Sequence, residues 1–312
     1  MGADPLSDVL SLVRARCVIS RGFCAGGEWG LRFAPPRRLK LHAAMKGGCW
    51  ILADDQPPVR LDEGDVIIHN GASSFVLANS PQARAVDAAD VFAASPEPIV
   101  SFGSAPAGDT IGIGGHVELD AAGQGLILSL LPPVTRIAAD TAAAAELRSL
   151  LGRLLREITR PRPGSDFAAE QHAQLVLVEV LRIAVDTADS PPPGWLRLLA
   201  DAGLRPAVNA IHREPARPWR LEELALESAM SRSSFATRFR AAAGESPVAY
   251  LNRWRIRLAE QALRDTETTV VRLARELGYA SESSFSHAFK RITAVSPSGY
   301  RSRERAGASA SA

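Results

Sequence analysis

Two short segments of the chain present polar side chains at spacings that suit contact with a nucleic acid. In each segment, two phenylalanines four residues apart mark the buried face of a helix, Phe235 with Phe239 and Phe285 with Phe289. The opposite face of the first helix carries Arg232, Ser233, Ala236, Thr237 and Arg240. The opposite face of the second carries Glu282, Ser283, Ser286, His287 and Lys290, followed by Arg291. Hydroxyl, imidazole and guanidinium groups in such an array can contact base edges and phosphates.

The two segments belong to a longer internal repeat. Residues 231–239 are echoed by residues 281–289, and the offset of 50 residues also relates two later pairs, Pro247 to Pro297 and Tyr250 to Tyr300. Upstream of the segments the offset is 49, so the second copy has one extra residue in its turn. A period of this size that occurs only twice indicates a duplicated module, because a solenoid needs at least three units.

Each copy also predicts a short helix and a tight turn ahead of its polar helix. In the first copy Leu221, Leu224 and Ala225 form an apolar stripe, and Ser231 offers an oxygen to cap the next helix. The equivalent residues of the second copy are Val270, Leu273, Ala274 and Leu277, the turn Gly278-Tyr279 and the cap Ser281. Two short helices joined in this way present the second helix to a DNA major groove. A helical bundle whose polar face is only solvated is the alternative, and the matched duplication favours DNA binding.

Charge is shared unevenly along the chain. The net charge is only +2, but residues 195–305 hold 19 Arg or Lys against 12 Asp or Glu, a net charge of +7. Residues 1–194 hold 17 against 22, a net charge of −5. A basic part attached to an acidic part fits phosphate contact by the basic part, whereas an ordinary solvated surface predicts no sharp split.

Length and composition limit the remaining possibilities. A chain of 312 residues can form two domains with sizeable cores, and 46% hydrophobic with 22% charged residues indicates a globular protein. No run reaches the ~18 apolar residues of a membrane span, and residues 1–8 lack a signal-peptide core, so we expect a cytoplasmic protein. The three cysteines, Cys17, Cys24 and Cys49, have no metal-ligand spacing, and in a reducing compartment we expect no disulfide.

The N-terminal half predicts strands after an initial amphipathic helix at residues 5–15. Short runs at 39–45, 49–53, 59–61, 66–68 and 74–77 are separated by turns containing Gly or Asp. Such runs predict a small antiparallel barrel or jelly roll. We expect the barrel to extend from about Cys17 to Leu131, with the Ala- and Pro-rich residues 79–106 as a long loop.

Helical spacing returns after Thr141. Residues 141–187 predict two antiparallel helices joined by a loop at 161–164, and residues 191–194 end a proline run that predicts a stiff linker. The fold class is therefore a multidomain α+β protein. We expect a first domain at 1–190, an all-α domain at 195–305 with a lead helix at 204–212, and a disordered tail at 306–312.

The repeat resembles the AraC/XylS family of bacterial transcription regulators. Leu224-Ala225, Met230-Ser231, Phe235 and Phe239 resemble the first helix-turn-helix of this family. The second family signature is matched by Gly278-Tyr279, Ser283-Ser284-Phe285, Phe289-Lys290, Ser296-Pro297 and Tyr300-Arg301. One departure is Ala294, where the family usually has Gly before Val-Ser-Pro. The first copy keeps that glycine as Gly244, so we expect strain or a slightly rebuilt turn at Ala294.

The resemblance implies roles for the polar faces. It implies that Ser233, Ala236, Thr237, Ser283, Ser286 and His287 face base edges. These side chains are mostly small, so methyl contacts to thymine and DNA shape would add to direct hydrogen bonding. We expect Arg232, Arg240, Lys290 and Arg291 to contact phosphates. The implied partners are promoter DNA, RNA polymerase, an unknown small-molecule effector and a second copy of the chain, with residues 141–187 at the dimer interface.

The N-terminal half is similar to the cupin-type sensor domain of one AraC subfamily. The residues that carry this similarity are 29–33, His42, 48–50 and 59–65. Cupin enzymes bind a metal through an H-x-H pair, a glutamate and a later histidine, but here Ala44 replaces the second histidine and no glutamate follows at the right distance. We therefore expect no metal and no cofactor. We interpret His42, Trp50 and His69 as candidate ligand-contacting residues, or as packed residues of the barrel.

A DNA-binding regulator is the function that the sequence favours. The helix that starts at Pro247 extends about 27 Å to Arg264, which can hold two recognition helices roughly one DNA turn, about 34 Å, apart. One alternative is a cupin-fold metal-dependent enzyme with an appended helical domain, although the incomplete metal motif argues against an enzyme. Another is a DNA-architectural protein whose barrel only dimerises. The effector, the operator and the sign of regulation stay open.

Overall fold

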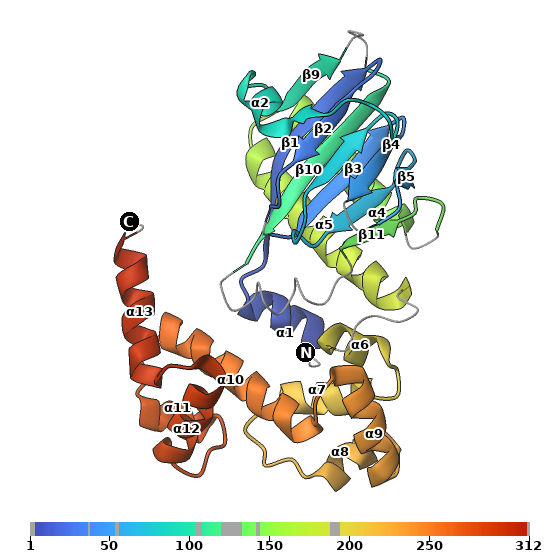
Figure 1. Cartoon of the computed structure of the whole chain (residues 1–312). Coiled ribbons are helices and arrows are strands. Elements are labelled where there is room, and N and C mark those ends of the chain that lie inside the picture. The colour runs from blue at the N-terminus through green and yellow to red at the C-terminus, as the bar shows by residue number, and fades with distance from the viewer. Residues whose placement is uncertain are drawn as a thin grey trace. The chain divides into compact units, whose positions relative to one another are not determined.

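The structure is a computed structural model that describes residues 4–36, 38–53, 56–103, 108–119, 133–141, 144–187 and 194–310. The chain divides into two compact units, each with its own core (Figure 1). The N-terminal unit comprises Val13–Pro192, and the helical unit comprises Met1–Leu12 together with Pro193–Ala312. Within the described residues, no helix is both long and apolar enough to cross a membrane.

The N-terminal unit is built on two mainly antiparallel sheets. The first sheet has the strand order β11-β6-β3-β10-β1-β9, and the second has the order β5-β4-β7-β2-β8. The first contains β1 (Arg16–Gly26), β3 (Lys40–Lys46), β6 (Val66–His69), β9 (Ile99–Gly103), β10 (Thr110–Glu118) and β11 (Val134–Ile137). The second contains β2 (Gly30–Phe33), β4 (Cys49–Ala53), β5 (Val59–Leu61), β7 (Phe75–Ala78) and β8 (Val86–Asp87). The α+β class is confirmed, with two open sheets in place of a closed barrel.

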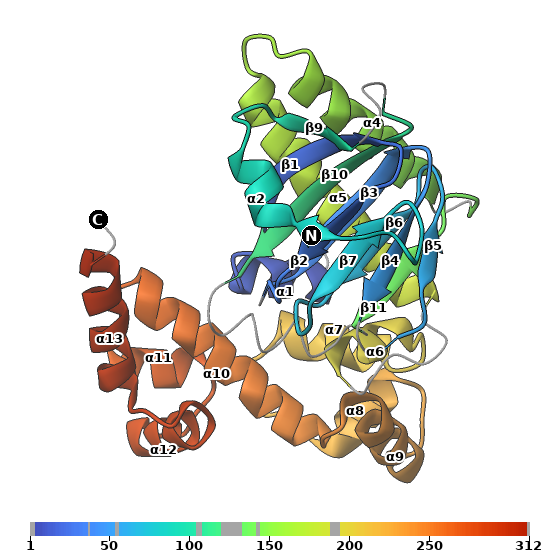
Figure 2. The same ribbon diagram turned by 45° about the horizontal axis from the view of Figure 1, so that its top comes forward.

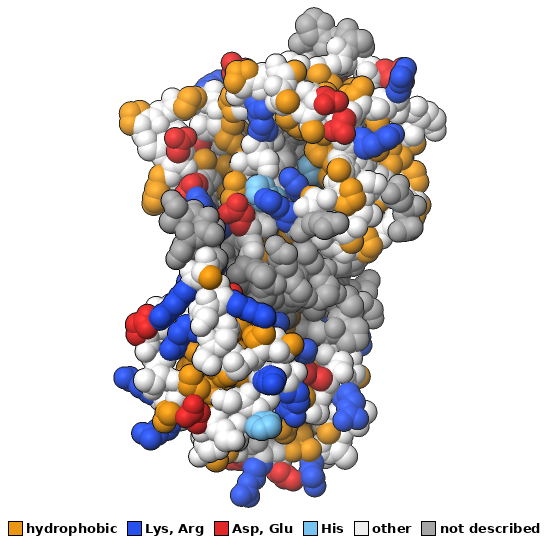
Figure 3. Space-filling model, turned by 60° about the vertical axis from the view of Figure 1, so that its left-hand side comes forward, with side chains coloured by type: hydrophobic (Ala, Val, Ile, Leu, Met, Phe, Trp, Pro, Cys, Tyr) orange, Lys and Arg blue, Asp and Glu red, His pale blue; other side chains and the backbone are white. Residues whose placement is uncertain are grey.

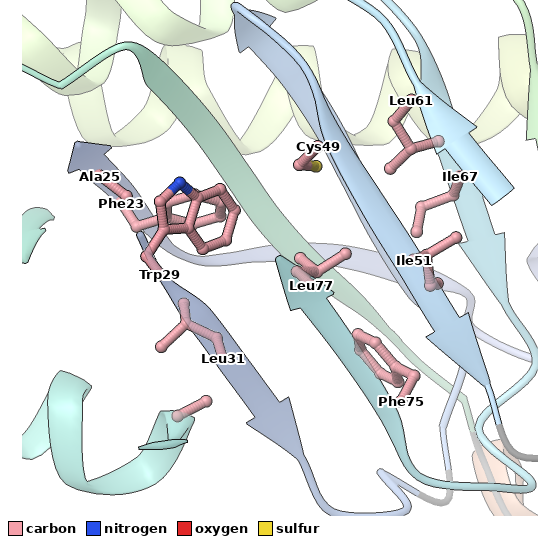
Figure 4. Close-up of a cluster of buried hydrophobic side chains, with 11 residues drawn as sticks. Phe23, Ala25, Trp29, Leu31, Cys49, Ile51, Leu61, Ile67, Phe75 and Leu77 are labelled. Carbon is pink, nitrogen blue, oxygen red and sulfur yellow. The ribbon is translucent and has the colours of Figure 1, made fainter. Parts of the chain in front are cut away.

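The two sheets enclose an apolar core (Figure 4). Phe23 of β1 and Ile67 of β6 meet Leu31, Phe75 and other residues of the second sheet, all with little or no solvent exposure. Burying an apolar side chain of this size stabilises the folded chain by about 1.5–3 kcal/mol. The short strands predicted from the sequence are present as β3 to β7, and β4, β5, β6 and β7 each supply residues to this core.

Two helices pack on the first sheet. They are α4 (Ala144–Thr159) and α5 (Ser165–Thr187), which lie against each other and contact β1, β3 and β11 (Figure 2). All four residues of β6 are buried, as in a strand whose two faces are both covered. Two large apolar side chains of α5 remain exposed, Phe167 at 70% and Leu175 at 51%.

The prediction of a long loop at residues 79–106 is wrong. This segment contains β8, the short helix α2 (Ala88–Ala93) and β9. Asp87 caps α2 by accepting a hydrogen bond from the Ala89 amide at 2.8 Å. The Arg21 guanidinium, far away in sequence, donates to the carbonyls of Phe92, Ser95 and Glu97. These contacts to β1 order a segment whose own composition is typical of a loop. The predicted barrel end, Leu131, lies outside the described residues.

The helical unit holds both copies of the repeat. Its elements are α6 (Trp195–Ala200), α7 (Arg205–Arg213), α8 (Leu221–Glu227), α9 (Arg232–Ala243), α10 (Pro247–Asp265), α11 (Val270–Glu276), α12 (Glu282–Thr293) and α13 (Pro297–Ala310). Residues 306–310, expected as part of a tail, continue α13, and residues 311–312 lie outside the described residues. The Arg, Glu and Ala residues of α13 are strong helix formers, so the helix extends beyond its core contacts.

The first helix, α1 (Pro5–Leu12), is part of the helical unit. Val9 and Leu12 are buried there, and α1 contacts α7 and α10. A buried histidine, His212, joins this contact because Nδ1 lies 3.1 Å from an Asp8 oxygen and Nε2 lies 2.9 Å from the Tyr250 hydroxyl. Sequence had placed residues 5–12 with the N-terminal domain, and these long-range contacts assign them to the helical unit.

Candidate nucleic-acid interface

The buried faces of α9 and α12 have the same geometry. Phe235 and Phe239 are fully buried with ring centroids 5.5 Å apart, and Phe285 and Phe289 are fully buried at 5.7 Å. A tyrosine closes each pair edge-on, Tyr250 at 5.7 Å from Phe239 and Tyr300 at 5.6 Å from Phe289. The predicted helical phase is confirmed, and it fixes which face of each helix meets solvent.

Both helices begin at the predicted caps. Ser231 accepts a hydrogen bond from the Ser234 amide at 3.3 Å, and Ser281 accepts one from the Ser284 amide at 3.1 Å. A serine cap of this kind stabilises a helix by ~1 kcal/mol. Because the four amides at a helix N-terminus carry partial positive charge, the capped ends also fix where that charge is presented.

The outward faces are exposed as predicted. On α9 the residues Arg232, Ser233, Thr237 and Arg240 are exposed and Ala236 is half-buried. On α12 the residues Glu282, Ser283, His287, Lys290 and Arg291 are exposed and Ser286 is half-buried. Each set lies on one surface of its helix, opposite the phenylalanine pair, so the structure brings the candidate DNA-contacting residues together in two groups.

The basic residues of the two groups differ in their partners. Arg232 forms an ion pair with Glu222 of α8 at 3.0 Å, which ties α9 to the helix before it. Arg240, Lys290 and Arg291 have no carboxylate partner within the described residues, so their charge is available to a phosphate. Figure 3 shows Arg and Lys side chains spread over the surface of the helical unit, which occupies the lower half of that view.

The long helix α10 joins the two motifs. It has 19 residues, so it extends about 28 Å, and Ser246 caps it by accepting from the Ala249 amide at 3.2 Å. Ile256, Ala259 and Leu263 of α10 pack with Phe285 and Phe289 in one cluster. Because α10 contacts both α9 and α12, it sets the separation between the two exposed faces.

Sequence gave no signal for Arg255, which fixes the junction between the motifs. This buried side chain of α10 donates to the carbonyls of Pro215 at 2.6 Å and Arg217 at 2.9 Å, in the turn between α7 and α8. Burial lowers the pKa of Arg255, and its guanidinium also lies 5.5 Å from the Tyr279 ring in the turn of the second motif. One arginine therefore ties the first motif, α10 and the second motif into a single block.

Family comparisons agree with this two-part organisation. A model described as "Cupin" matches residues 4–186, and a model described as "Helix-turn-helix domain" matches residues 224–303. A putative AraC-like transcription regulator of Streptomyces lividans is 38% identical over 299 residues, which cover 96% of this chain and 98% of that protein. The chain belongs to the AraC-like transcription regulators. It is a DNA-binding regulator with a cupin-type N-terminal domain, as the sequence patterns predicted.

More distant relatives of this regulator carry related names. The HTH-type transcriptional regulator AlkR of Acinetobacter baylyi is 29% identical over 282 residues, which cover 88% of this chain and 91% of AlkR. Among solved structures, the DNA-binding domain of AdpA in complex with a target DNA is 28% identical, with a TM-score of 0.31. That match covers 32% of this chain and 94% of the AdpA domain.

The three ligand candidates of the cupin-type domain lie in different surroundings. His42 of β3 is buried and lines a cavity, against the rings of Phe33 and Phe75. His69 is also buried, but its Nδ1 accepts a hydrogen bond from the Gly71 amide at 3.0 Å. This hydrogen bond gives His69 a structural role in the turn after β6. The Trp50 ring lies 5.7 Å from the Arg60 guanidinium and does not line that cavity.

No group of three or more His, Cys, Asp or Glu side chains in the described part of the chain could hold a metal ion. The three cysteines are unpaired. Burial raises the pKa values of the Cys17 and Cys49 thiols to about 12, so both stay protonated and unreactive at neutral pH.

Proposed function

We propose that α9 and α12 of one chain enter successive major-groove segments on one face of promoter DNA. The observation that supports this is the pair of exposed, serine-capped faces joined through α10, whose length of about 28 Å is comparable with the ~34 Å of one DNA turn. Arg255 supports it further, because it makes the spacing of the two faces a fixed property of the helical unit.

We assign separate tasks to the exposed residues. Those in the middle of each face read bases: Ser233, Ala236, Thr237, Ser283, Ser286 and His287. Those on the flanks contact phosphates: Arg232, Arg240, Lys290 and Arg291. Glu282, in the first turn of α12, complements the helix dipole and can accept a hydrogen bond from cytosine. Small side chains dominate, so shape and thymine methyl contacts carry part of the specificity.

The N-terminal unit has the role of a sensing and dimerisation domain in this proposal. It binds a small-molecule effector in the cavity beside His42, and it pairs with a second copy through α4 and α5. Phe167 and Leu175 support the pairing, because large apolar side chains exposed on one helix mark interaction surfaces. The regulator then acts in the cytoplasm, on promoter DNA and together with RNA polymerase.

Salt-dependent binding tests the DNA-binding role. The full chain should bind a DNA fragment from upstream of its own or a neighbouring gene more tightly than unrelated DNA. Because several phosphates are neutralised, log affinity should fall steeply and linearly with log salt concentration. Fluorescence anisotropy across a salt series measures this. Equal affinity for every fragment, or an affinity that salt leaves unchanged, would refute the proposal.

Dimerisation has its own test. Light scattering of the full chain at micromolar concentration should give twice the monomer mass of 33.2 kDa. Phe167→Glu should shift the mass to that of the monomer, because a buried charge without a partner is costly. The matched control is Leu226→Glu on α8, where the side chain is also exposed. A dimer that survives Phe167→Glu and Leu175→Glu together would exclude this surface.

A further inference from the structure

A cavity of about 380 Å³ in the N-terminal unit is bounded by strands of both sheets and by α2. This volume is within the range of small-molecule sites, roughly 300–1,000 Å³. Its lining residues come from β1, β2, β3, β8, β10 and α2 and from the residues after β2, all of which belong to the N-terminal unit. The chemistry of the lining can therefore be considered within that unit alone.

Gly114 makes room for the cavity. In β10 it pairs with Arg21 of β1 on one side and with His42 of β3 on the other. A Cβ at Gly114 would lie 3.3 Å from both Cε1 and Nδ1 of the His42 ring. A larger side chain would displace this imidazole or fill the space, so the absence of a side chain here opens the floor of the cavity.

The side of the cavity formed by α2 is held in place by hydrogen bonds from Arg21 and to Asp87. Arg21 donates to the Phe92, Ser95 and Glu97 carbonyls, and the Asp87 carboxylate caps α2 through the Ala89 amide. These contacts hold the wall in place without a ligand. The charged groups left to meet a ligand must come from β2 and β3.

Three aromatic rings give the cavity an apolar side. Phe23, Phe33 and Phe92 all line it, and the rings of Phe33 and Phe92 are 6.5 Å apart. Phe33 is fixed from behind by Phe75, which stacks on it at 4.7 Å. Rings arranged in this way favour a flat apolar body, because offset and edge-on aromatic contacts are stabilising.

Two cations face this apolar surface. Arg32 and Lys40 line the cavity and have no carboxylate partner within the described residues. Burial, and the positive charge of Arg38, lower the pKa of Lys40, so an anion beside it would stabilise its charged form. Burial lowers the pKa of His42 to about 3, which keeps the imidazole neutral, and its Nε2 has no hydrogen-bond partner. Arg21, Arg32 and Lys40 outnumber the one carboxylate of the lining, Asp87, so the net charge of the lining is positive.

We propose that this cavity binds a small aromatic monocarboxylate, with its carboxylate on Lys40 and Arg32 and its ring among Phe23, Phe33 and Phe92. His42 lies beside the bound ring and offers a neutral hydrogen-bonding group. This inference rests on the proposed function, since it states the chemical class of the effector. It adds the residues that select an acid over its neutral analogue.

Calorimetry on the full chain tests the class of ligand. The acids are benzoate, 3-phenylpropionate and 2-naphthoate, each compared with its neutral amide, and 2-naphthylmethylamine is the cationic probe. At least one acid should bind, at least tenfold more tightly than its amide, and the amine should not bind. Equal affinity for acid and amide, binding of the amine, or no binding by any of the three acids would overturn the proposal.

Variants of the chain distinguish the contribution of the Lys40 charge to ligand binding from that of the cavity shape. Lys40→Met should weaken acid binding at least tenfold and leave the amide unchanged. Lys46→Met, on the same strand but outside the cavity, should change neither. Gly114→Val should remove binding of acid and amide alike by filling the floor, with circular dichroism showing that the fold is kept. If Lys40→Met binds the acid as tightly as Lys46→Met does, the assigned anion contact is wrong.

Promoter binding is measured on the same preparations, so that the two proposals can fail separately. A chain that binds promoter DNA with a steep salt dependence but binds no aromatic acid refutes the cavity assignment alone. A chain that binds the acid but shows no preference among DNA fragments refutes the proposed reading of DNA and leaves the cavity assignment standing.

Discussion

The two helix-turn-helix copies have cores of the same design but differ in the residues that surround them. Phe235 and Phe285 occupy the same place, and each copy has a serine cap and an edge-on tyrosine. The outward faces have diverged, with Thr237 where the second copy has His287. The two copies therefore have the same residues where the helical phase is set, and they differ at exposed positions that we propose contact DNA. This pattern is expected when packing is constrained and the exposed surface is free to specify a sequence.

Each copy has two positions with a left-handed backbone. At each of these positions, one copy has glycine where the other has alanine. In the turn before the recognition helix, the first copy has Ala229 at φ 50° and the second has Gly278 at φ 75°. At the end of the recognition helix, the first has Gly244 at φ 78° and the second has Ala294 at φ 63°. An L-residue in this region costs about 1–2 kcal/mol. Each copy thus carries one strained turn, at opposite ends of its recognition helix.

Phe235→Ala and Phe285→Ala should have the largest effects, and the effects should be equal. Each change should cost ~3–5 kcal/mol, because a fully buried ring leaves a cavity. Hydrogen exchange of the full chain should show faster exchange in α9 for the first variant and in α12 for the second. Leu226→Ala, where the side chain is 80% exposed, is the control and should change little. Unchanged protection in either phenylalanine variant would mean that the helical phase is misassigned.

Gly278→Ala should lower the free energy of unfolding more than Gly244→Ala does. Both changes place a side chain at a left-handed position and cost about 1–2 kcal/mol for that reason. At Gly278 the added Cβ would also lie 1.9 Å from the Ala216 carbonyl oxygen, so the turn that Arg255 holds must move. Thermal unfolding measures the two losses. A loss at Gly244 that equals or exceeds the loss at Gly278 would contradict this account of the junction.

Arg238 forms an ion pair that stabilises the first copy and has no equivalent in the second. Its guanidinium makes two hydrogen bonds of 2.7 Å to Asp201 after α6, whereas Ala288 occupies the equivalent position of α12. Arg238→Ala should cost roughly 0.5–1 kcal/mol, because a two-pronged pair at the surface is screened by solvent. The neighbouring Arg240→Ala, which loses no ion pair within the described residues, is the control. Equal stability of the two variants would show that the Arg238–Asp201 ion pair contributes nothing to the free energy of unfolding.

The features of the two copies that depend on local residue spacing could be predicted from the sequence. The phenylalanine pairs, serine caps and the strain at Ala294 follow from residues within one or two helical turns, and the structure has each of them. The same holds for β3 to β7, which are visible in the sequence as short runs between turns that contain Gly or Asp.

Features that join distant residues were not predictable in this way. Arg255 meets a turn about 40 residues away, α1 packs on helices about 200 residues away, and Arg21 orders α2 across 71 residues or more. The cavity depends on Gly114 lying in register between two other strands. No periodicity in a single segment records such pairings, which is why a long loop was expected at 79–106 and the packing of residues 5–12 against α7 and α10 was not predicted.

Ala294→Gly should have an effect as small as that of Arg238→Ala, but in the stabilising direction. Relief of the left-handed alanine gains about 1–2 kcal/mol, and the greater freedom of glycine in the unfolded chain removes about 0.5–1 kcal/mol. The net gain should be about 0.5–1 kcal/mol, seen as a higher Tm. Ala243→Gly, inside α9, should instead destabilise, since that residue is in regular helix. A lower Tm for Ala294→Gly would show that the second turn is not strained.

Binding selection on randomised DNA tests the central claim most directly, using the full chain and its Thr237→Ala, His287→Ala and Arg240→Ala variants. Thr237 and His287 should each discriminate between bases by about 1–3 kcal/mol, so each variant should change the preferred motif, at positions about one helical turn apart. Arg240→Ala should keep the motif, weaken every site alike and reduce the salt slope by about one unit. If Thr237→Ala and His287→Ala leave the motif unchanged while Arg240→Ala alters it, the assignment of the two faces is contradicted.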